Sequence, residues 1–318
     1  MSETSLIQAD KIQVDFTSKS GLFQPELTTT VLSNISFRLP PGSILGVVGE
    51  SGSGKTTLAK VILGLIKPSK GNVTTDKTLD LHRDIQFIFQ DPIEALNPRM
   101  RVEELILEPL DYLDTNLDTR SRQQRLKDMM RKVGLDYGQR YRYPHEFSGG
   151  QCQRIGIARA MISQPKVLIC DEPVSALDVS IRAQIIELLK DLQQSMNLSL
   201  IFIAHDLSLV RYISDQVLVL YKGRIMETGQ VEEVFAHPQH PYTQDLIQAE
   251  PKPDPQLEKQ RQQAQKLLST EEVTTKETGC VYLARCQYVQ DECQQRQPDS
   301  VRAGNDQKVA CFYPLDTL

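Results

Sequence analysis

The chain has 318 residues, a mass of 36.0 kDa, a formal net charge of −5 at pH 7 and a sequence pI near 5.7. This length is enough for one large α/β domain and a smaller appendage, and the acidic balance lacks the basic excess of a nucleic-acid-binding protein. The sequence has no run of 18 apolar residues, and its first residues lack the pattern of a signal peptide. We therefore expect a cytoplasmic chain whose six cysteines are free or metal-bound rather than paired in disulfides.

The first part of the chain has the residue patterns of β-strands. Residues 5–16 and 31–38 alternate polar and apolar side chains, which predicts an antiparallel β element. The short apolar run 43–48 follows and has the composition of a buried strand.

A glycine-rich loop, residues 49–56 (GESGSGKT), comes directly after this run and precedes a helix-like stretch at 57–63. Strand, glycine loop and helix in this order indicate a P-loop. Its backbone N–H groups would face phosphate oxygens at the positive end of the helix. Lys55 would reach the β- and γ-phosphates, and Thr56 would offer its hydroxyl to Mg²⁺. The residues that we expect to contact the nucleotide here are Gly49, Ser51, Gly52, Ser53, Gly54, Lys55, Thr56 and Thr57.

Further buried strands are predicted at residues 85–89, 166–170 and 199–204. The second run leads into Asp171 and Glu172, and P-loop enzymes present an aspartate to Mg²⁺ at the end of such a strand. Glu172 would then polarise the water that attacks the γ-phosphate. Carboxylates at strand ends are commonly paired or solvated, but the P-loop in the same chain favours the catalytic interpretation.

A charged segment with helical periodicity, residues 101–142, separates the first two of these strands. We expect it to belong to a helical subdomain inserted at about residues 93–163. Pro, Gln, Glu and Lys dominate residues 251–278, which read as a linker or an exposed helical spacer.

Six motifs stand in the order found in ATPase subunits of ABC transporters, and the chain resembles that family over about residues 5–235. The resemblance implies a P-loop NTPase of ABC type, with an antiparallel β subdomain, the inserted helical subdomain and a small C-terminal extension that carries cysteines. The motifs are the P-loop, Gln90 after a strand, Ser148-Gly149-Gly150-Gln151, residues 167–172, Ser175-Ala176-Leu177-Asp178, and His205.

The resemblance also implies a role for each motif. ATPases of this family pair head to tail, so Ser148, Gly149, Gly150 and Gln151 would hold the γ-phosphate of ATP bound to the partner, and Asp178 would act across the interface. The resemblance gives a catalytic set of Glu172, His205 and Gln90, and a Mg²⁺ set of Thr56, Gln90 and Asp171.

An aromatic side chain late in the first strand stacks on adenine in this family. Phe16 stands where that residue should fall, and Phe23 is the competing candidate. Phe16 could equally belong to the core, because aromatic side chains bury well in either setting.

A finer resemblance is to the oligopeptide and dipeptide importers, and within them to the F-type ATPase subunit. It rests on residues 87–100, residues 143–154 and the segment 237–243 (HPQHPYT). It implies a paralogous D-type ATPase partner, two transmembrane permease subunits and a periplasmic or extracellular substrate-binding protein, at the cytoplasmic face of the cell membrane. A nickel or glutathione importer of the same family is the alternative, followed by a soluble ABC ATPase that acts on nucleic acid or ribosomes.

Four cysteines near the C-terminus have the spacing C-x5-C-x6-C-x17-C, within an extension that we place at residues 236–318 and a cysteine motif at 279–314. This is not the paired spacing of a common zinc site. Four thiolates are the ligand set of a [4Fe–4S] cluster, and residues 279–286 resemble the tail of importer ATPases that carry one. Zinc and unligated cysteines remain alternatives. The four residues are Cys280, Cys286, Cys293 and Cys311, whereas Cys152 and Cys170 are expected to be packing residues.

Overall fold

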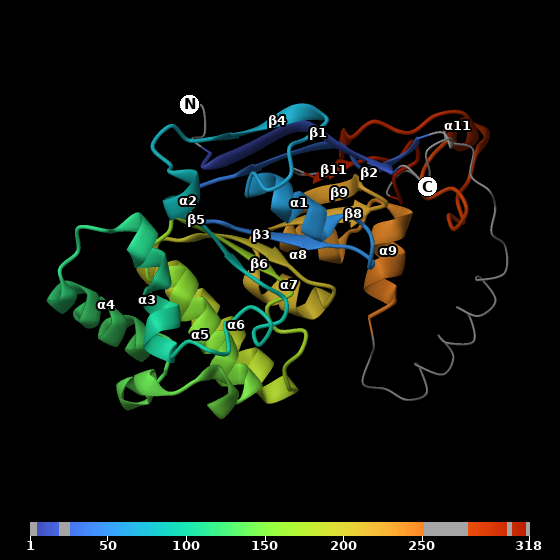
Figure 1. The fold of residues 1–318 in the computed structure, drawn as a ribbon. Coiled ribbons are helices and arrows are strands. Elements are labelled where there is room, and N and C mark those ends of the chain that lie inside the picture. The colour runs from blue at the N-terminus through green and yellow to red at the C-terminus, as the bar shows by residue number, and fades with distance from the viewer. Residues whose placement is uncertain (1–4, 19–25, 251–278, 304–306, 316–318) are drawn as a thin grey trace.

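The computed structural model describes residues 5–18, 26–250, 279–303 and 307–315, and contains two β-sheets with helices around them (Figure 1). The smaller sheet is antiparallel, with the order β2-β1-β4. Its strands are β1 (Ile7–Ser18), β2 (Leu27–Leu39) and β4 (Lys70–Thr75). The antiparallel β subdomain predicted from the alternating pattern is therefore confirmed.

The larger sheet has the strand order β10-β11-β9-β8-β3-β7-β6-β5. Its centre is parallel and consists of β8 (Gln216–Tyr221), β3 (Ile44–Val48), β7 (Ser199–Ile203), β6 (Val167–Asp171) and β5 (Ile85–Ile88). Every residue of β3, β6 and β7 is buried, as expected for parallel strands with both faces covered.

Helix α1 (Lys55–Ile62) lies between the two sheets (Figure 1), and its apolar side chains share a core with both of them. The opposite face of the large sheet packs against α6 (Val179–Met196), α7 (Leu207–Ile213) and α8 (Val231–Ala236). The P-loop connects β3 to α1, and both elements have side chains in the core between the two sheets, so both ends of the loop are anchored.

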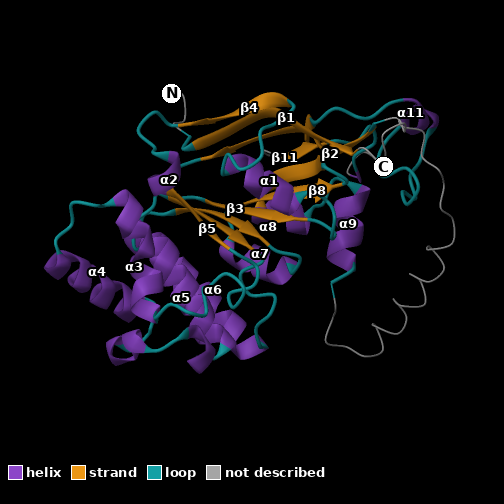
Figure 2. Cartoon of the chain, viewed as in Figure 1, coloured by secondary structure: helices purple, strands orange, loops and turns teal. Residues whose placement is uncertain are grey.

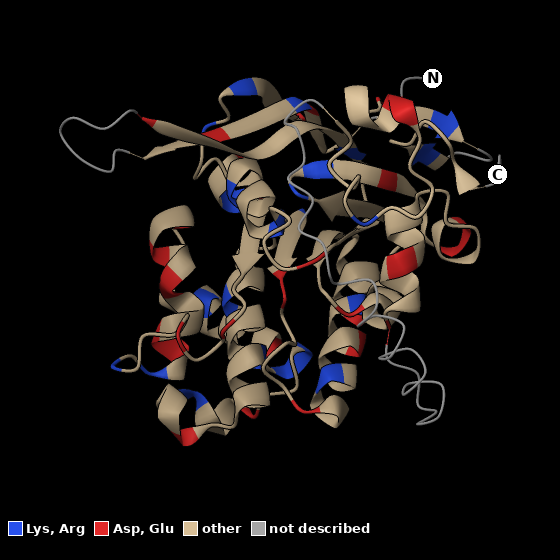
Figure 3. Ribbon diagram, turned by 90° about the vertical axis from the view of Figure 1, so that its right-hand side faces the viewer, with Lys and Arg blue, Asp and Glu red and all other residues tan. Residues whose placement is uncertain are grey.

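A group of helices forms the inserted subdomain, as the periodicity predicted (Figure 2). It contains α3 (Val102–Leu113), α4 (Thr119–Lys132), the short helices η1 (Tyr137–Tyr141) and η2 (Pro144–Glu146), and α5 (Gly149–Met161). Charges of both signs stand on these helices (Figure 3). Ion pairs join them: Arg125 lies 2.8 Å from Asp114, and Arg159 of α5 lies 2.7 Å from Glu108 of α3.

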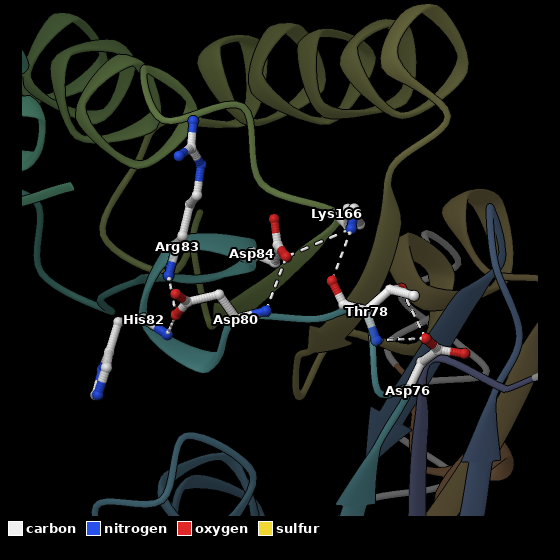
Figure 4. A network of polar contacts seen from close by, with 7 residues as sticks. All are labelled: Asp76, Thr78, Asp80, His82, Arg83, Asp84 and Lys166. Carbon is white, nitrogen blue, oxygen red and sulfur yellow. Dashed lines mark hydrogen bonds and ion pairs between the residues drawn. The ribbon is translucent and has the colours of Figure 1, made fainter. Parts of the chain in front are cut away.

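A polar network fixes the amino-terminal ends of β5 and β6 (Figure 4). The Lys166 ammonium, just before β6, donates to the Thr78 carbonyl at 3.3 Å and to the Asp84 carboxylate at 3.4 Å. Asp84 also accepts the backbone N–H of Asp80, whose side chain caps the short helix α2 (Leu81–Asp84). With these ends anchored, the carboxyl ends of both strands present their loops at the opposite edge of the sheet.

The C-terminal part contributes strands to the larger sheet itself. After β9 (Arg224–Gln230) and α8, the chain forms α9 (Pro241–Gln248), then α11 (Asp291–Gln295), β10 (Val301–Ala303) and β11 (Gln307–Val309). Strand β11 pairs antiparallel with β9, with Val309 opposite Glu227 (Figure 1). The sequence patterns did not predict these strands. The boundary at residue 235 stays a prediction, and the linker at 251–278 lies outside the described residues. In the described part of the chain, no helix combines the length and apolarity needed to cross a membrane.

Candidate nucleotide site

Glycines shape the loop between β3 and α1. Gly49 has φ +152°, and a Cβ there would lie 2.1 Å from the Leu220 carbonyl oxygen. Gly54 caps α1 with φ +104°, a left-handed conformation that favours glycine. Gly52 has φ +77°, and a Cβ added there would have no neighbouring atom within 4 Å. The loop therefore has the close packing beneath it and the open face above it that a phosphate cradle requires.

Lys55 begins α1 and is buried. Its ammonium donates to the Gly49 carbonyl at 2.8 Å and to the Glu50 carbonyl at 3.0 Å. Burial lowers the pKa of Lys55, against the opposing effect of the nearby carboxylates Glu172 and Asp171. A desolvated ammonium at a helix N-terminus is well suited to bind phosphate oxygens.

Asp171 ends β6 beside Thr56, the second residue of α1. Burial raises the pKa of Asp171, whereas a hydrogen bond from Thr56 and the charge of Lys55 lower it. A carboxylate, a hydroxyl and the amide oxygen of Gln90 form the all-oxygen donor set that Mg²⁺ prefers. The residues present therefore fit the ion that the fold implies.

Glu172 contacts two other candidate catalytic residues. The Gln90 amide donates to a Glu172 carboxylate oxygen at 3.1 Å, and Nδ1 of His205 lies 3.4 Å from the same oxygen. Glu172 also has φ +47°, an uncommon conformation for a residue other than glycine. Strained backbone of this kind gathers at functional sites. Because Glu172, Gln90 and His205 follow the carboxyl ends of β6, β5 and β7, the parallel sheet places them at one edge.

The Ser-Gly-Gly-Gln motif begins α5 on the helical subdomain. Ser148 caps this helix, since its hydroxyl accepts the Gln151 N–H, and the Gln151 side chain accepts the Ser148 N–H. In the part of the chain that the structure describes, these two residues hydrogen-bond each other and not the P-loop. Gly150 packs under Ile181, where a Cβ would meet a side-chain carbon at 2.5 Å. The exposed Ser148 and the exposed Asp178, at the start of α6, are thus available to another molecule.

Phe16 lies near the end of β1, opposite Thr29 of β2. Its side chain is 46% exposed, so it stands on the surface rather than in the core. An exposed ring at this place can stack on a planar base. The competing Phe23 lies outside the described residues.

The four C-terminal cysteines line one cavity of about 20 Å³, together with Tyr282 and Tyr313. All four are free thiols. Burial raises the pKa of Cys280 and Cys286, and that of Cys311 to about 11. Among the residues that the structure describes, no group of three or more His, Cys, Asp or Glu is placed to hold a metal ion. Cys152 and Cys170 are buried in the core, in agreement with a packing role.

The C-terminal part contacts the P-loop, and the sequence patterns did not predict these contacts. The Tyr242 hydroxyl accepts the Glu50 backbone N–H at 3.1 Å, and Arg285 donates to the Glu50 carboxylate at 2.8 Å. These residues are 192 and 235 positions from Glu50, so no local sequence signal could have linked them.

The fold and the site define an ATPase of the ABC class: a P-loop beside an acid pair, and a Ser-Gly-Gly-Gln helix start on an inserted helical subdomain. Comparison with known families agrees. The ABC transporter model matches residues 32–175, and the model of the oligopeptide/dipeptide transporter C-terminal region matches residues 226–293.

Curated relatives match along nearly the whole chain. The oligopeptide transport ATP-binding protein OppF of Salmonella typhimurium is 48% identical, over 98% of this chain and 97% of its own. OppF of Haemophilus influenzae is 46% identical, and the dipeptide transport ATP-binding protein DppF of the same organism is 40% identical, each with coverages of 98% and 97%. The chain belongs to the ATP-binding subunits of ABC transporters, in the oligopeptide and dipeptide transporter family.

Solved structures show the same fold. CbiO1 from Clostridium perfringens, part of the ABC transporter complex cbiONQ, has a TM-score of 0.64 at 27% identity, covering 74% of this chain and 92% of its own. A dimeric ATP-binding cassette in a post-hydrolysis state, bound to ADP and Pi, has a TM-score of 0.61 at 25% identity, covering 71% and 98%.

Proposed function

We propose that this chain binds and hydrolyses ATP to power an importer of oligopeptides or dipeptides, at the cytoplasmic face of the cell membrane. The observation that carries the proposal is that Gln90 and His205 both meet one carboxylate oxygen of Glu172, at the sheet edge that holds the P-loop. Relatives over nearly the full length are named as transport ATP-binding proteins for oligopeptides and dipeptides.

The chemistry follows from the residues in the site. The N–H groups of the P-loop and Lys55 bind the phosphates of ATP, and Phe16 stacks on adenine. Thr56, Asp171 and Gln90 would hold Mg²⁺, and the ion would supply positive charge to neutralise the phosphates. Glu172 accepts a proton from water as the water oxygen bonds to the γ-phosphorus. The bond from that phosphorus to the β–γ bridging oxygen breaks, which leaves ADP and phosphate. His205, 3.4 Å from Glu172, hydrogen-bonds the γ-phosphate and stabilises the transition state.

The working unit in this proposal is a head-to-tail dimer. Ser148 and Gln151 hydrogen-bond each other at the start of α5, which leaves this exposed helix start to complete the site of another subunit. The similar ATP-binding cassette with bound ADP and Pi is itself dimeric. We propose a paralogous D-type subunit as the partner.

An apolar groove of about 290 Å³ supports a membrane-protein partner. It lies between the core and the helical subdomain, and its lining includes Phe89, Pro92 and Arg159. Phe89 is 53% exposed and Ile93 60%, so exposed apolar side chains stand on both sides of Gln90 in the sequence. A permease segment in this groove would sense any movement of Gln90 in the nucleotide site.

We also propose that the four C-terminal cysteines hold a [4Fe–4S] cluster. All four line one cavity as free thiols, which provides the required number of ligands. Zinc and unligated thiols are the alternatives.

Reconstitution tests the function. The chain, a D-type ATPase and two permease subunits are placed in liposomes that enclose ATP, and uptake of labelled peptide is measured with the peptide and the substrate-binding protein outside. We expect ATP-dependent peptide uptake that the Glu172→Gln variant abolishes. Uptake of nickel or glutathione in place of peptide would overturn the cargo assignment, and specific binding to DNA or ribosomes without any permease would overturn the transport role.

A further inference from the structure

Glu50, the second residue of the P-loop, is held from two directions by the C-terminal part of the chain. The hydroxyl of Tyr242, in α9, accepts its backbone N–H at 3.1 Å. Nη1 of Arg285 donates to its two carboxylate oxygens at 2.8 and 3.0 Å. Backbone and side chain of one loop residue are thus both fixed by segments more than 190 positions away.

The same residue contacts the phosphate-binding lysine. The carbonyl of Glu50 accepts from the Lys55 ammonium at 3.0 Å. A change in the backbone of Glu50 therefore moves an acceptor of Lys55. This connects Arg285 and Tyr242 to the side chain that would bind the β- and γ-phosphates.

Aromatic packing makes this support rigid. Tyr242 is fully buried, and its ring lies 4.5 Å from that of Tyr221 and 5.3 Å from that of Tyr282. The Arg285 guanidinium lies 5.5 Å from the centre of the Tyr282 ring and 6.0 Å from that of Tyr221. The hydroxyl of Tyr282 in turn donates to Asp245 of α9. Arg285 is thus oriented by two rings before it meets Glu50.

Arg285 also belongs to the turn that carries the cysteines. The N–H groups of Arg285 and Cys286 both donate to the Tyr282 carbonyl, at 3.1 Å each. Tyr282 lines the cavity of the four thiols. The position of Arg285 therefore depends on the fold of this turn.

We propose that Arg285 is a positioning residue for the P-loop, which makes nucleotide affinity depend on the folded state of the C-terminal cysteine segment. The inference rests on the proposed function, because it assumes that the P-loop binds ATP. Arg285 acts through Glu50 and does not touch the nucleotide. The guanidinium and the carboxylate are 47% and 41% exposed, so water screens the pair and its effect is modest. We expect its loss to weaken affinity about two- to fivefold.

The experiment measures the affinity of the purified full chain for a non-hydrolysable ATP analogue. The variants are Arg285→Ala, Arg285→Lys, Glu50→Gln and the double variant, with Arg296→Ala as the matched control. Arg296 lies in the same segment and pairs with Glu292 of that segment, rather than with the P-loop. Hydrogen exchange of the amides at residues 49–55 is followed in parallel.

We expect Arg285→Ala to weaken binding and to speed exchange in the P-loop, and Arg285→Lys to restore part of both. In the Glu50→Gln background, Arg285→Ala should have little further effect, because the two residues act as one unit. An equal loss of affinity in both backgrounds, or an Arg285→Ala variant that behaves like Arg296→Ala, would overturn the inference. The Lys55→Ala variant distinguishes failure of the proposed function from failure of the positioning role. If Lys55→Ala leaves the affinity unchanged, the proposed function is wrong. If Lys55→Ala weakens binding and Arg285→Ala leaves it unchanged, only the positioning role is wrong.

Discussion

Nδ1 of His205 lies 3.4 Å from a carboxylate oxygen of Glu172, at the carboxyl edge of the parallel sheet. In the proposed mechanism this imidazole hydrogen-bonds the γ-phosphate beside the carboxylate that activates water. The adjacent acid, Asp171, is buried and accepts a hydrogen bond from Thr56, and we propose that it binds Mg²⁺ instead. We propose separate roles for these neighbouring acids, because Asp171 ends β6 whereas Glu172, with φ +47°, lies just after the strand.

The Glu172→Gln variant should retain ATP binding and lose turnover, because the amide cannot accept a proton from water. We expect phosphate release to fall on the order of 10²- to 10⁴-fold, the usual contribution of a general base. ATP should then trap a closed dimer, which size-exclusion chromatography with the partner ATPase detects. Near-normal hydrolysis would reject this role for Glu172. Glu232→Gln, at an exposed glutamate of α8 that pairs with Arg211, is the control.

The Lys55→Ala variant should bind ATP about 10- to 100-fold more weakly, since it loses charge-assisted hydrogen bonds to phosphate. Calorimetric titration with a non-hydrolysable analogue measures the change. Lys127→Ala removes an exposed charge on α4 and should leave affinity unaltered. Equal affinities of the Lys55 variant and the parent would contradict the P-loop assignment.

Gly46→Ala should destabilise the protein. Gly46 lies in β3, and an added Cβ would stand 2.4 Å from a Val210 methyl and 2.7 Å from the Ser214 hydroxyl of the adjoining α7 segment. Overpacking of this kind costs about 1–3 kcal/mol of unfolding free energy, which urea titration measures. Gly156→Ala, in α5 with open space around the Cβ, should instead stabilise by about 0.5–1 kcal/mol. Equal effects of the two substitutions on the unfolding free energy would contradict the close packing of α7 on β3.

Protein purified without oxygen should contain about four irons per chain if the cysteines hold a [4Fe–4S] cluster. Cys280→Ser should remove most of this iron, because it takes away one of the four thiols around the cavity. Cys152→Ser should keep it, since Cys152 is buried in α5. Elemental analysis and absorption spectra distinguish the outcomes, and zinc in place of iron refutes the cluster.

The local signals of the chain were sufficient for much of the fold. Period-two alternation predicted β1 and β2, and unbroken apolar runs predicted β5, β6 and β7, because burial on one face or on both leaves a distinct pattern. The P-loop was readable because the conformations of Gly49, Gly52 and Gly54 favour glycine. Strands β10 and β11 have three residues each, too few to carry such a pattern.

The sequence by itself determined the chemical inventory: Lys55 on a glycine loop, an acid pair after a buried strand, a Ser-Gly-Gly-Gln helix start and four cysteines in a tail. Only the tertiary structure decided which of these meet. Parallel pairing brought Gln90, Glu172 and His205 together at one edge of the sheet. The packing of the C-terminal part also joined Arg285 to Glu50, which lies 235 positions away in the sequence. Both are non-local contacts, which depend on strand order and packing rather than on the spacing of residues along the chain.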